Sequence, residues 1–177
     1  VLDLTHMLSG PYAGMMLADL GAETIKVEPP ISGEGTRRIL EKDPNNSLNG
    51  LGAYFITLNR NKKSVTLNLK SEKGLEIFYE LVKSADVVLS NFSAGVTERL
   101  KIDHASLSGI NPRIITCSIT GFGESGPGKD RTSLDLVAQA MSGLMSLTGQ
   151  PGNLPTRAGI PIGDIGGGLM GVIGILS

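Results

Sequence analysis

The chain has little cysteine, few aromatic side chains and almost no net charge. Of its 177 residues, one is cysteine, none is tryptophan and 4% are aromatic. A single cysteine cannot form an internal disulfide, so we expect a reducing, cytoplasmic environment. Because aromatic side chains are scarce, we expect a core of aliphatic side chains. Sixteen basic and 17 acidic residues give a net charge of −1, without a basic block. We therefore expect neither a nucleic-acid nor a membrane partner.

The chain also lacks a long hydrophobic run. Its longest apolar stretch, near residues 169–176, is shorter than the roughly 20 residues that cross a bilayer. No charged-then-apolar leader opens it, so we expect no secretory signal. It starts in a strand-like run and stops in an apolar helix without a cap, which predicts that it is part of a longer protein.

Short apolar segments alternate with segments of helical periodicity along the chain. The strand-like segments are 1–4, 23–27, 54–58, 64–69, 86–89 and 113–119. The helical ones are 11–20, 71–84, 96–100, 103–108, 135–147 and a last helix after Pro161. Residues 31–52 predict a long irregular loop, and the nearly continuous apolar run 113–119 is typical of a strand buried on both faces. This alternation predicts an α/β fold with a mainly parallel sheet.

A glycine-rich loop follows the last predicted strand. The run Gly121-Phe122-Gly123-Glu124-Ser125-Gly126 matches the G-x-G-x-x-G pattern of dinucleotide-binding loops. That motif needs a helix at the third glycine, but Pro127 follows it. The region also nearly forms a P-loop, except that Asp130 replaces the Ser or Thr that binds magnesium. We therefore expect a glycine-rich surface loop, able to touch a ligand through its backbone, and not a nucleotide site.

The two histidines predict no metal centre. His6 and His104 are far apart in sequence, without a Cys/His cluster near either. His104 is expected in the first turn of a helix. His6 ends the first predicted strand, and open α/β sheets place ligands just beyond the carboxyl ends of their strands.

Asp164 is an isolated carboxylate in the run Gly163-Asp164-Ile165-Gly166-Gly167-Gly168. An aspartate that precedes a helix can accept backbone hydrogen bonds as its N-cap, which contributes about 1 kcal/mol. The glycines cost roughly 0.5–1 kcal/mol each inside a helix, and close approach of a ligand or another helix would compensate. A carboxylate ionised at pH 7 is also a competent nucleophile. Both a helix cap and a catalytic group remain open from the residues alone.

Several longer motifs occur in a fixed order along the chain. They include Leu17-Ala18-Asp19-Leu20-Gly21-Ala22-Glu23, Leu58-Asn59-Arg60-Asn61-Lys62-Lys63-Ser64, Ala85-Asp86-Val87-Val88-Leu89-Ser90-Asn91-Phe92 and the Asp164 run. Together they resemble the family III CoA-transferases, the CaiB/BaiF-like family that includes formyl-CoA transferases and 2-methylacyl-CoA racemases. The resemblance implies a Rossmann-like sheet with flanking helices, incomplete without a C-terminal part. Residues 1–177 would form the N-terminal portion of the large CoA-binding domain, without the small domain, in an interlocked homodimer.

The family's nucleophilic aspartate falls on Asp164. The resemblance implies attack on an acyl-CoA thioester to give a mixed anhydride, then an aspartyl-CoA thioester from which a second carboxylic acid takes CoA. Acyl-CoA and a carboxylic acid would be the partners, and CoA would enter as a substrate, with no permanently bound cofactor. The implied CoA contacts are His6, Met7, Ser9, Arg37, Leu67, Leu69, Lys70, Asn91, Phe92 and Arg99. The implied substrate-side residues are Leu8, Gly121, Phe122 and Gly123.

Departures from the family pattern bear on the reaction. The racemase branch pairs its aspartate with a histidine just before Asp135, where this chain has Leu134. The missing acid–base partner favours a transferase, although residues 163–168 also resemble the racemase form of the motif. Leu8 and Thr120 replace a glutamine and a lysine of some members. A third hypothesis is a non-catalytic CoA-binding module, and the presence of Asp164 argues against it.

Overall fold

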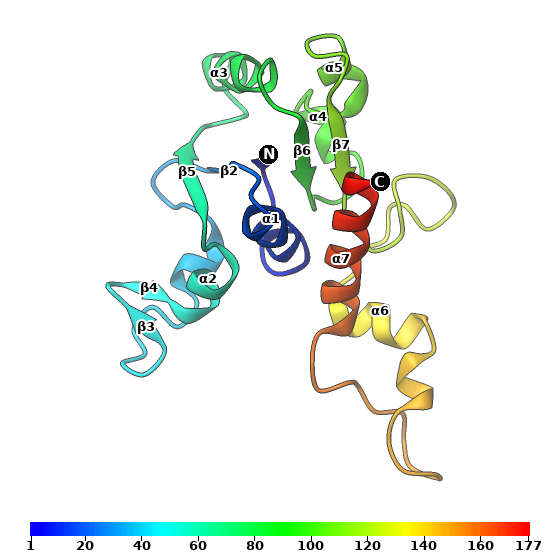
Figure 1. Ribbon diagram of the computed structural model, residues 1–177. Helices are drawn as coiled ribbons and strands as arrows, with labels where there is room; N and C mark the ends of the chain where they lie inside the picture. The colour runs from blue at the N-terminus through cyan, green and yellow to red at the C-terminus, as the bar shows by residue number, and fades with distance from the viewer.

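A five-stranded parallel sheet forms the centre of the computed structural model, which describes residues 1–177 (Figure 1). The strand order is β5-β2-β1-β6-β7, and each neighbouring pair is parallel. The strands are β1 (Leu2–Asp3), β2 (Thr24–Glu28), β5 (Lys62–Thr66), β6 (Val87–Ser90) and β7 (Ile115–Ser118). The predicted α/β fold with a mainly parallel sheet is confirmed.

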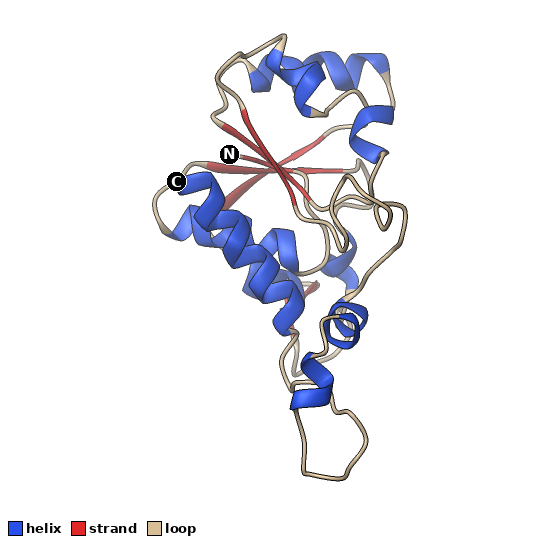
Figure 2. Ribbon diagram, turned by 90° about the vertical axis from the view of Figure 1, so that its right-hand side faces the viewer, coloured by secondary structure: helices blue, strands red, loops and turns tan.

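Helices cover both faces of this sheet (Figure 2). The longer ones are α1 (Ser9–Asp19), α3 (Glu72–Val82) and α7 (Ile162–Leu176), and the shorter ones are α4 (Val96–Arg99), α5 (His104–Ser108) and α6 (Asp135–Met141). Side chains of α3 and α5 build one hydrophobic core, and α1 and α7 build the other. Val88 and Leu89, neighbours on β6, belong to different cores, because successive strand residues point to opposite faces. None of the helices combines the length and apolar character needed to cross a bilayer.

A buried ionic cluster joins β1, β2 and β5. The Asp3 carboxylate lies 2.7 Å from Lys62 Nζ and 3.8 Å from Lys26 Nζ, and all three side chains are almost fully buried. Lys26 also donates to the Thr5 carbonyl at 2.8 Å, and Lys62 donates to the Pro11 carbonyl at 2.8 Å. The cluster therefore fixes both ends of the segment that leads from β1 into α1.

The prediction of an extended segment at residues 54–58 is wrong. These residues belong to α2 (Ala53–Leu58), which buries Phe55 and Leu58, three positions apart on one helical face. Its β-branched and aromatic side chains favour a strand by propensity, but packing against α1 and η1 (Gly35–Arg38) decides the conformation. The predicted loop 31–52 thus contains η1, and it also contains the antiparallel strands β3 (Ser47–Leu48) and β4 (Leu51–Gly52).

Two further predictions are corrected at the other end of the sheet. The run 113–119 does form a strand, but β7 lies at the sheet edge with Ile115 44% exposed, so it is not buried on both faces. The predicted helix 135–147 breaks after Met141, because Gly143 adopts a left-handed conformation before η2 (Leu144–Leu147). Its predicted apolar side is exposed at Leu136 and Leu147, and α6 instead buries Gln139.

Candidate active site

The carboxyl ends of β1, β6 and β7 and the first turn of α7 enclose a cavity of about 340 Å³, called here the Asp164 cavity. Parallel strands end at the same edge of a sheet, so the segments that follow them converge. The predicted site residues that line this cavity are His6, Met7, Leu8, Ser9, Asn91, Phe92, Gly121, Phe122 and Asp164. These residues span most of the chain length and meet only in the folded structure.

The segment after β1 is held by hydrogen bonds to neighbouring segments. The Asn91 side chain accepts from the His6 amide at 2.8 Å and donates to the His6 carbonyl at 2.7 Å. The Met7 amide donates to the Glu34 carboxylate at 3.1 Å, and Met7 has a positive φ of 63°. The ring centroids of His6 and Phe92 lie 5.2 Å apart. Burial, and then the nearby charge of Lys26, lowers the pKa of His6, which is therefore neutral at pH 7.

Asp164 is not the N-cap of its helix, so the capping interpretation is wrong. Helix α7 begins at Ile162, and Pro161 occupies the cap position without a side-chain hydrogen bond. The Asp135 carboxylate from α6 takes that role: it accepts from the Gly163 amide at 2.8 Å and the Asp164 amide at 3.4 Å. The Asp164 carboxylate accepts no hydrogen bond and lines the cavity. Burial, and then the negative charge of Asp135, raises its pKa.

Gln139 extends the support of this helix start. Its side chain is 1% exposed and donates to the other Asp135 oxygen at 2.7 Å. The Gln139 side-chain oxygen accepts from the Ala158 amide at 2.8 Å. One turn of α6 therefore holds both the loop before α7 and the first turn of α7, leaving the Asp164 carboxylate free.

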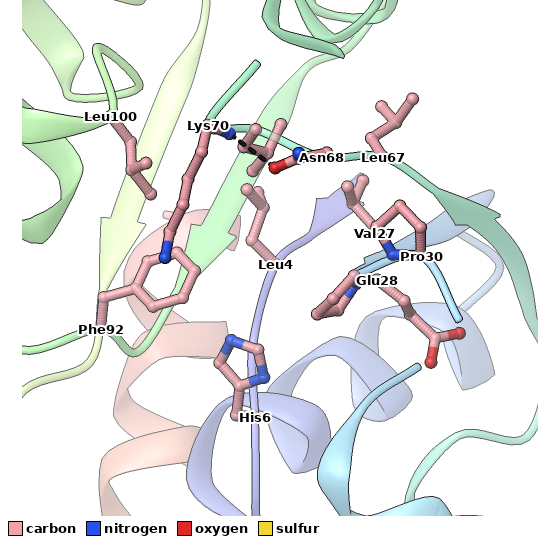
Figure 3. Close-up of a pocket in the computed structure, with 12 residues that line it drawn as sticks. Leu4, His6, Val27, Glu28, Pro30, Leu67, Asn68, Lys70, Phe92 and Leu100 are labelled. Atoms are coloured by element: carbon pink, nitrogen blue, oxygen red, sulfur yellow. Dashed lines mark hydrogen bonds between the residues drawn. The ribbon is translucent and has the colours of Figure 1, made fainter. Parts of the chain in front are cut away.

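A second cavity of about 290 Å³ adjoins the first and shares His6 and Phe92 with it (Figure 3). Most of its lining is apolar. The lining residues include Leu4, Val27, Pro29, Pro30, Leu67, Leu69, Lys70 and Leu100. Figure 3 shows Lys70, Phe92 and His6 on one side of the cavity and Val27 and Pro30 on the other.

A third, open cavity of about 430 Å³ continues from the second. The two share Leu69, Lys70 and Leu100, and the third adds Arg99 and Lys101. The three cavities form a series that begins at the Asp164 carboxylate and passes a mainly apolar lining, in which Glu28 is paired with Arg37. The series ends at Lys70, Arg99 and Lys101, with Glu72 as the one carboxylate beside them. This arrangement suits an extended ligand with a reactive group at one end and negative charge at the other.

Two of the predicted site residues do not line these cavities. Gly123 lies just outside, with a φ of 82°. The Arg37 guanidinium forms two hydrogen bonds to the Glu28 carboxylate, at 2.7 and 2.6 Å, and lies 3.9 Å over the Phe55 ring. Although burial of Glu28 opposes its charge, hydrogen bonds from Arg37 and Ser64 lower the Glu28 pKa to about 2. Arg37 therefore forms an ion pair with Glu28 and does not line the cavities.

Several further polar residues of this region are not predicted from the sequence. They are Lys129 and Arg131 in the Asp164 cavity, Lys101 beside Arg99, and the supporting pair Asp135 and Gln139. The four-residue spacing of Asp135 and Gln139 places them on one helical face, which was an available signal. Nothing in their local sequence indicates that they reach a helix start more than 20 residues away.

The sequence matches the family described as CoA-transferase family III over residues 1–177. It is 45% identical to the acetyl-CoA:oxalate CoA-transferase of Acetobacter aceti, over 100% of this chain and 44% of that protein. It is 41% identical to the succinate–glutarate CoA-transferase of Agrobacterium fabrum, over 99% of this chain and 44% of that protein. The crystal structure of a CAIB/BAIF family protein from Brucella suis superposes with a TM-score of 0.91 at 42% identity, covering 99% of this chain and 46% of that chain. The chain spans less than half the length of these relatives.

Proposed function

The chain belongs to CoA-transferase family III, and on that basis we propose that the natural protein moves CoA from an acyl-CoA thioester to a carboxylic acid. The observation that carries this proposal is the Asp164 carboxylate, which lines a cavity while Asp135 takes up the helix N–H groups in its place. A carboxylate free of hydrogen bonds and with a raised pKa is a better nucleophile than one neutralised by a helix start.

The proposed reaction proceeds through covalent intermediates on Asp164. An Asp164 oxygen attacks the thioester carbonyl, the C–S bond breaks, and a mixed anhydride and CoA thiolate form. The thiolate attacks the aspartyl carbonyl and releases the first acid as a carboxylate, leaving an aspartyl-CoA thioester. The second acid attacks that carbonyl to form a new anhydride and free the thiolate, which takes the acyl group and regenerates Asp164.

The series of cavities supports a binding mode for CoA. The thioester would lie beside Asp164, and the uncharged arm of CoA would pass His6 and Phe92. The phosphates would lie near Lys70, Arg99 and Lys101. Residues 1–177 would be the N-terminal part of a large CoA-binding domain, and the complete protein would form an interlocked homodimer.

A dicarboxylic acid is the proposed substrate class. The two relatives named above are called an oxalate and a glutarate CoA-transferase, and both of those acids carry two carboxylates. Racemisation is less well supported, because it needs a second acid–base group beside Asp164. Leu134 stands where the racemase branch has its histidine, and its side chain in the Asp164 cavity carries no acid–base group.

Trapping of the covalent intermediate tests this function. The complete natural protein is incubated with acetyl-CoA and then with hydroxylamine, which converts an aspartyl thioester or anhydride into a hydroxamate. Mass spectrometry of the peptide containing Asp164 should find this product in the wild-type protein and not in Asp164→Asn. An unmodified Asp164, combined with exchange of the α-proton of a 2-methylacyl-CoA in deuterium oxide, would favour the racemase instead.

A further inference from the structure

The loop between β7 and α6 brings two cations to the Asp164 cavity. Lys129 and Arg131 are the only Lys or Arg residues that line it. The loop leaves β7 and returns to α6 (Figure 1), and its residues Lys129, Arg131, Thr132 and Ser133 line the same cavity as Asp164. The remaining ionisable groups in this lining are Asp164 and His6, and His6 is neutral at pH 7 because its pKa is lowered.

Neither cation has an anionic partner in the fold. The six ion pairs of the structure involve other residues, and neither side chain donates a hydrogen bond to a protein group. Arg37 provides the contrast, because its guanidinium is fully engaged by Glu28. Lys129 and Arg131 therefore keep their donors available for a ligand in the cavity.

Phe122 orients the Arg131 guanidinium. The guanidinium carbon lies 4.8 Å from the centre of the Phe122 ring, which lines the same cavity. Stacking uses the face of the guanidinium and leaves its N–H edge free, and that edge matches a carboxylate with two parallel hydrogen bonds. Phe122 in turn packs against the backbone of its own loop, because a Cβ at Gly128 would lie 3.5 Å from it.

We propose that Arg131 and Lys129 bind the non-reacting carboxylate of a dicarboxylic acid while its other carboxyl group reacts at Asp164. This inference rests on the proposed transferase function and names the residues that select the acid. A monocarboxylic acid would present an apolar end to two unpaired cations, whereas a dicarboxylic acid offers them a charge-assisted partner. The leaving acid and the entering acid both react at Asp164, so the same two cations would bind whichever of them carries a second carboxylate.

The test compares two acceptors of equal chain length in the complete natural protein. Glutarate and pentanoate are each supplied with acetyl-CoA, a donor whose acyl group has no second carboxylate. Arg131→Met should lower kcat/KM for glutarate on the order of 10- to 100-fold, the range expected for losing a hydrogen-bonded charge pair. The rate with pentanoate should change by less than about 3-fold, and the KM for acetyl-CoA should not change.

Three further variants sharpen the result. Arg131→Lys keeps the charge without the two-pronged geometry and should fall between wild type and Arg131→Met. Lys129→Met should reduce the preference for glutarate in the same direction, and it tests the proposal if Arg131→Met does not fold. Arg113→Met is the matched control: Arg113 is exposed near the amino end of β7, lines none of the described cavities, and should leave both acids unaffected.

Three outcomes would overturn the proposal. They are an equal loss with both acids, a rise in the KM for acetyl-CoA with the glutarate preference unchanged, and a wild-type enzyme that does not prefer glutarate. Each of them is measured as transferase activity, so each leaves the proposed CoA transfer through Asp164 intact, and only the third also removes the proposed preference for dicarboxylic acids. Failure of the proposed function would instead be seen as the absence of the Asp164 hydroxamate in the wild-type protein.

Discussion

At the scale of single residues, two carboxylates meet at the start of α7 and take different roles. Asp135 accepts the N–H groups of Gly163 and Asp164, and Asp164 keeps both oxygens free. A negative charge near a helix N-terminus is favourable, so the helix supports this pair despite their mutual repulsion. Burial, and then the repulsion from Asp135, raises the pKa of Asp164, which increases the basicity of the proposed nucleophile.

The pH dependence of the proposed reaction should reveal this pair. Asp164 must be ionised to attack, so its raised pKa moves the acidic limb of the kcat/KM profile upward. Asp135→Asn keeps an oxygen that can accept the two N–H groups, loses the hydrogen bond from Gln139, and removes the negative charge. The acidic limb should therefore move to lower pH. The acidic limb should not reach the position expected for an unperturbed aspartate, because burial is the larger cause of the raised pKa of Asp164 and remains in the variant.

Asp135→Ala separates the capping role from the charge. It removes the cap, which costs about 1 kcal/mol of stability, and lets the start of α7 shift, so kcat should fall while the KM for acyl-CoA holds. Asp135→Asn should restore part of that kcat, because its amide oxygen still accepts from Gly163 while its NH2 group cannot accept from Gln139. Profiles of kcat/KM and kcat against pH for the three proteins provide the measurement. An acidic limb at the same pH in wild type and Asp135→Asn would refute the role of the Asp135 charge.

At the scale of elements, the glycines of α7 are explained mainly by helix and sheet packing. A Cβ at Gly168 would lie 2.6 Å from the Ser9 carbonyl oxygen of α1, and one at Gly171 would lie 3.4 Å from Cys117 Sγ on β7. Close approach to another helix was one of the two compensations expected for these glycines. Gly163 and Gly167 additionally line the Asp164 cavity. The apolar helix therefore places Asp164 by packing tightly against α1 and β7.

Two alanine substitutions in α7 should have opposite effects. Gly168→Ala must push α7 away from the α1 backbone, and overpacking of this kind costs about 1–3 kcal/mol. Gly166→Ala meets nothing within 4 Å and should gain roughly 0.5–1 kcal/mol, because alanine favours a helix over glycine. Urea unfolding of the complete natural protein measures both. Gly168→Ala should also lower kcat, since Asp164 lies one turn away. Equal stability changes in the two variants would contradict the packing explanation.

The sequence alone predicts an element when the element's own residues stabilise it, and fails when contacts with other elements decide its conformation. The run of β6, Val87–Ser90, is mainly apolar and enclosed in the sheet, so its composition and length suffice to predict a strand. The segment of α2 has the propensity of a strand, and only its contacts with α1 and η1 make it a helix. The same distinction applies to the site. The strand ends that carry His6 and Asn91 were predicted, whereas the Asp135 cap and the Arg37–Glu28 pair depend on tertiary contacts.

At the scale of the whole molecule, the ionic cluster of Asp3, Lys26 and Lys62 links the sheet to the site. It joins β1, β2 and β5 and holds the segment that leads to His6. Burial opposes the charge of Asp3, but Lys26 and Lys62 outweigh it and hold the Asp3 pKa below its usual 3.8. Each charge is therefore tolerated in the interior only because the others are present.

Asp3→Asn should consequently destabilise the complete natural protein far more than a surface change does. The substitution leaves two buried lysines without a counter-charge, which costs about 3–5 kcal/mol. Lys62→Met removes one of the cations, keeps Asp3 close to Lys26 and should cost less. Since the folded-state pKa of Asp3 is lowered, its contribution is complete above its unfolded pKa near 3.8 and is lost progressively as the pH falls from there through the folded-state pKa. Urea unfolding at pH 7 and pH 3 measures both effects, and the difference between wild type and Asp3→Asn should shrink at pH 3. A difference that is the same at both pH values would show that Asp3 contributes through packing and not through its charge.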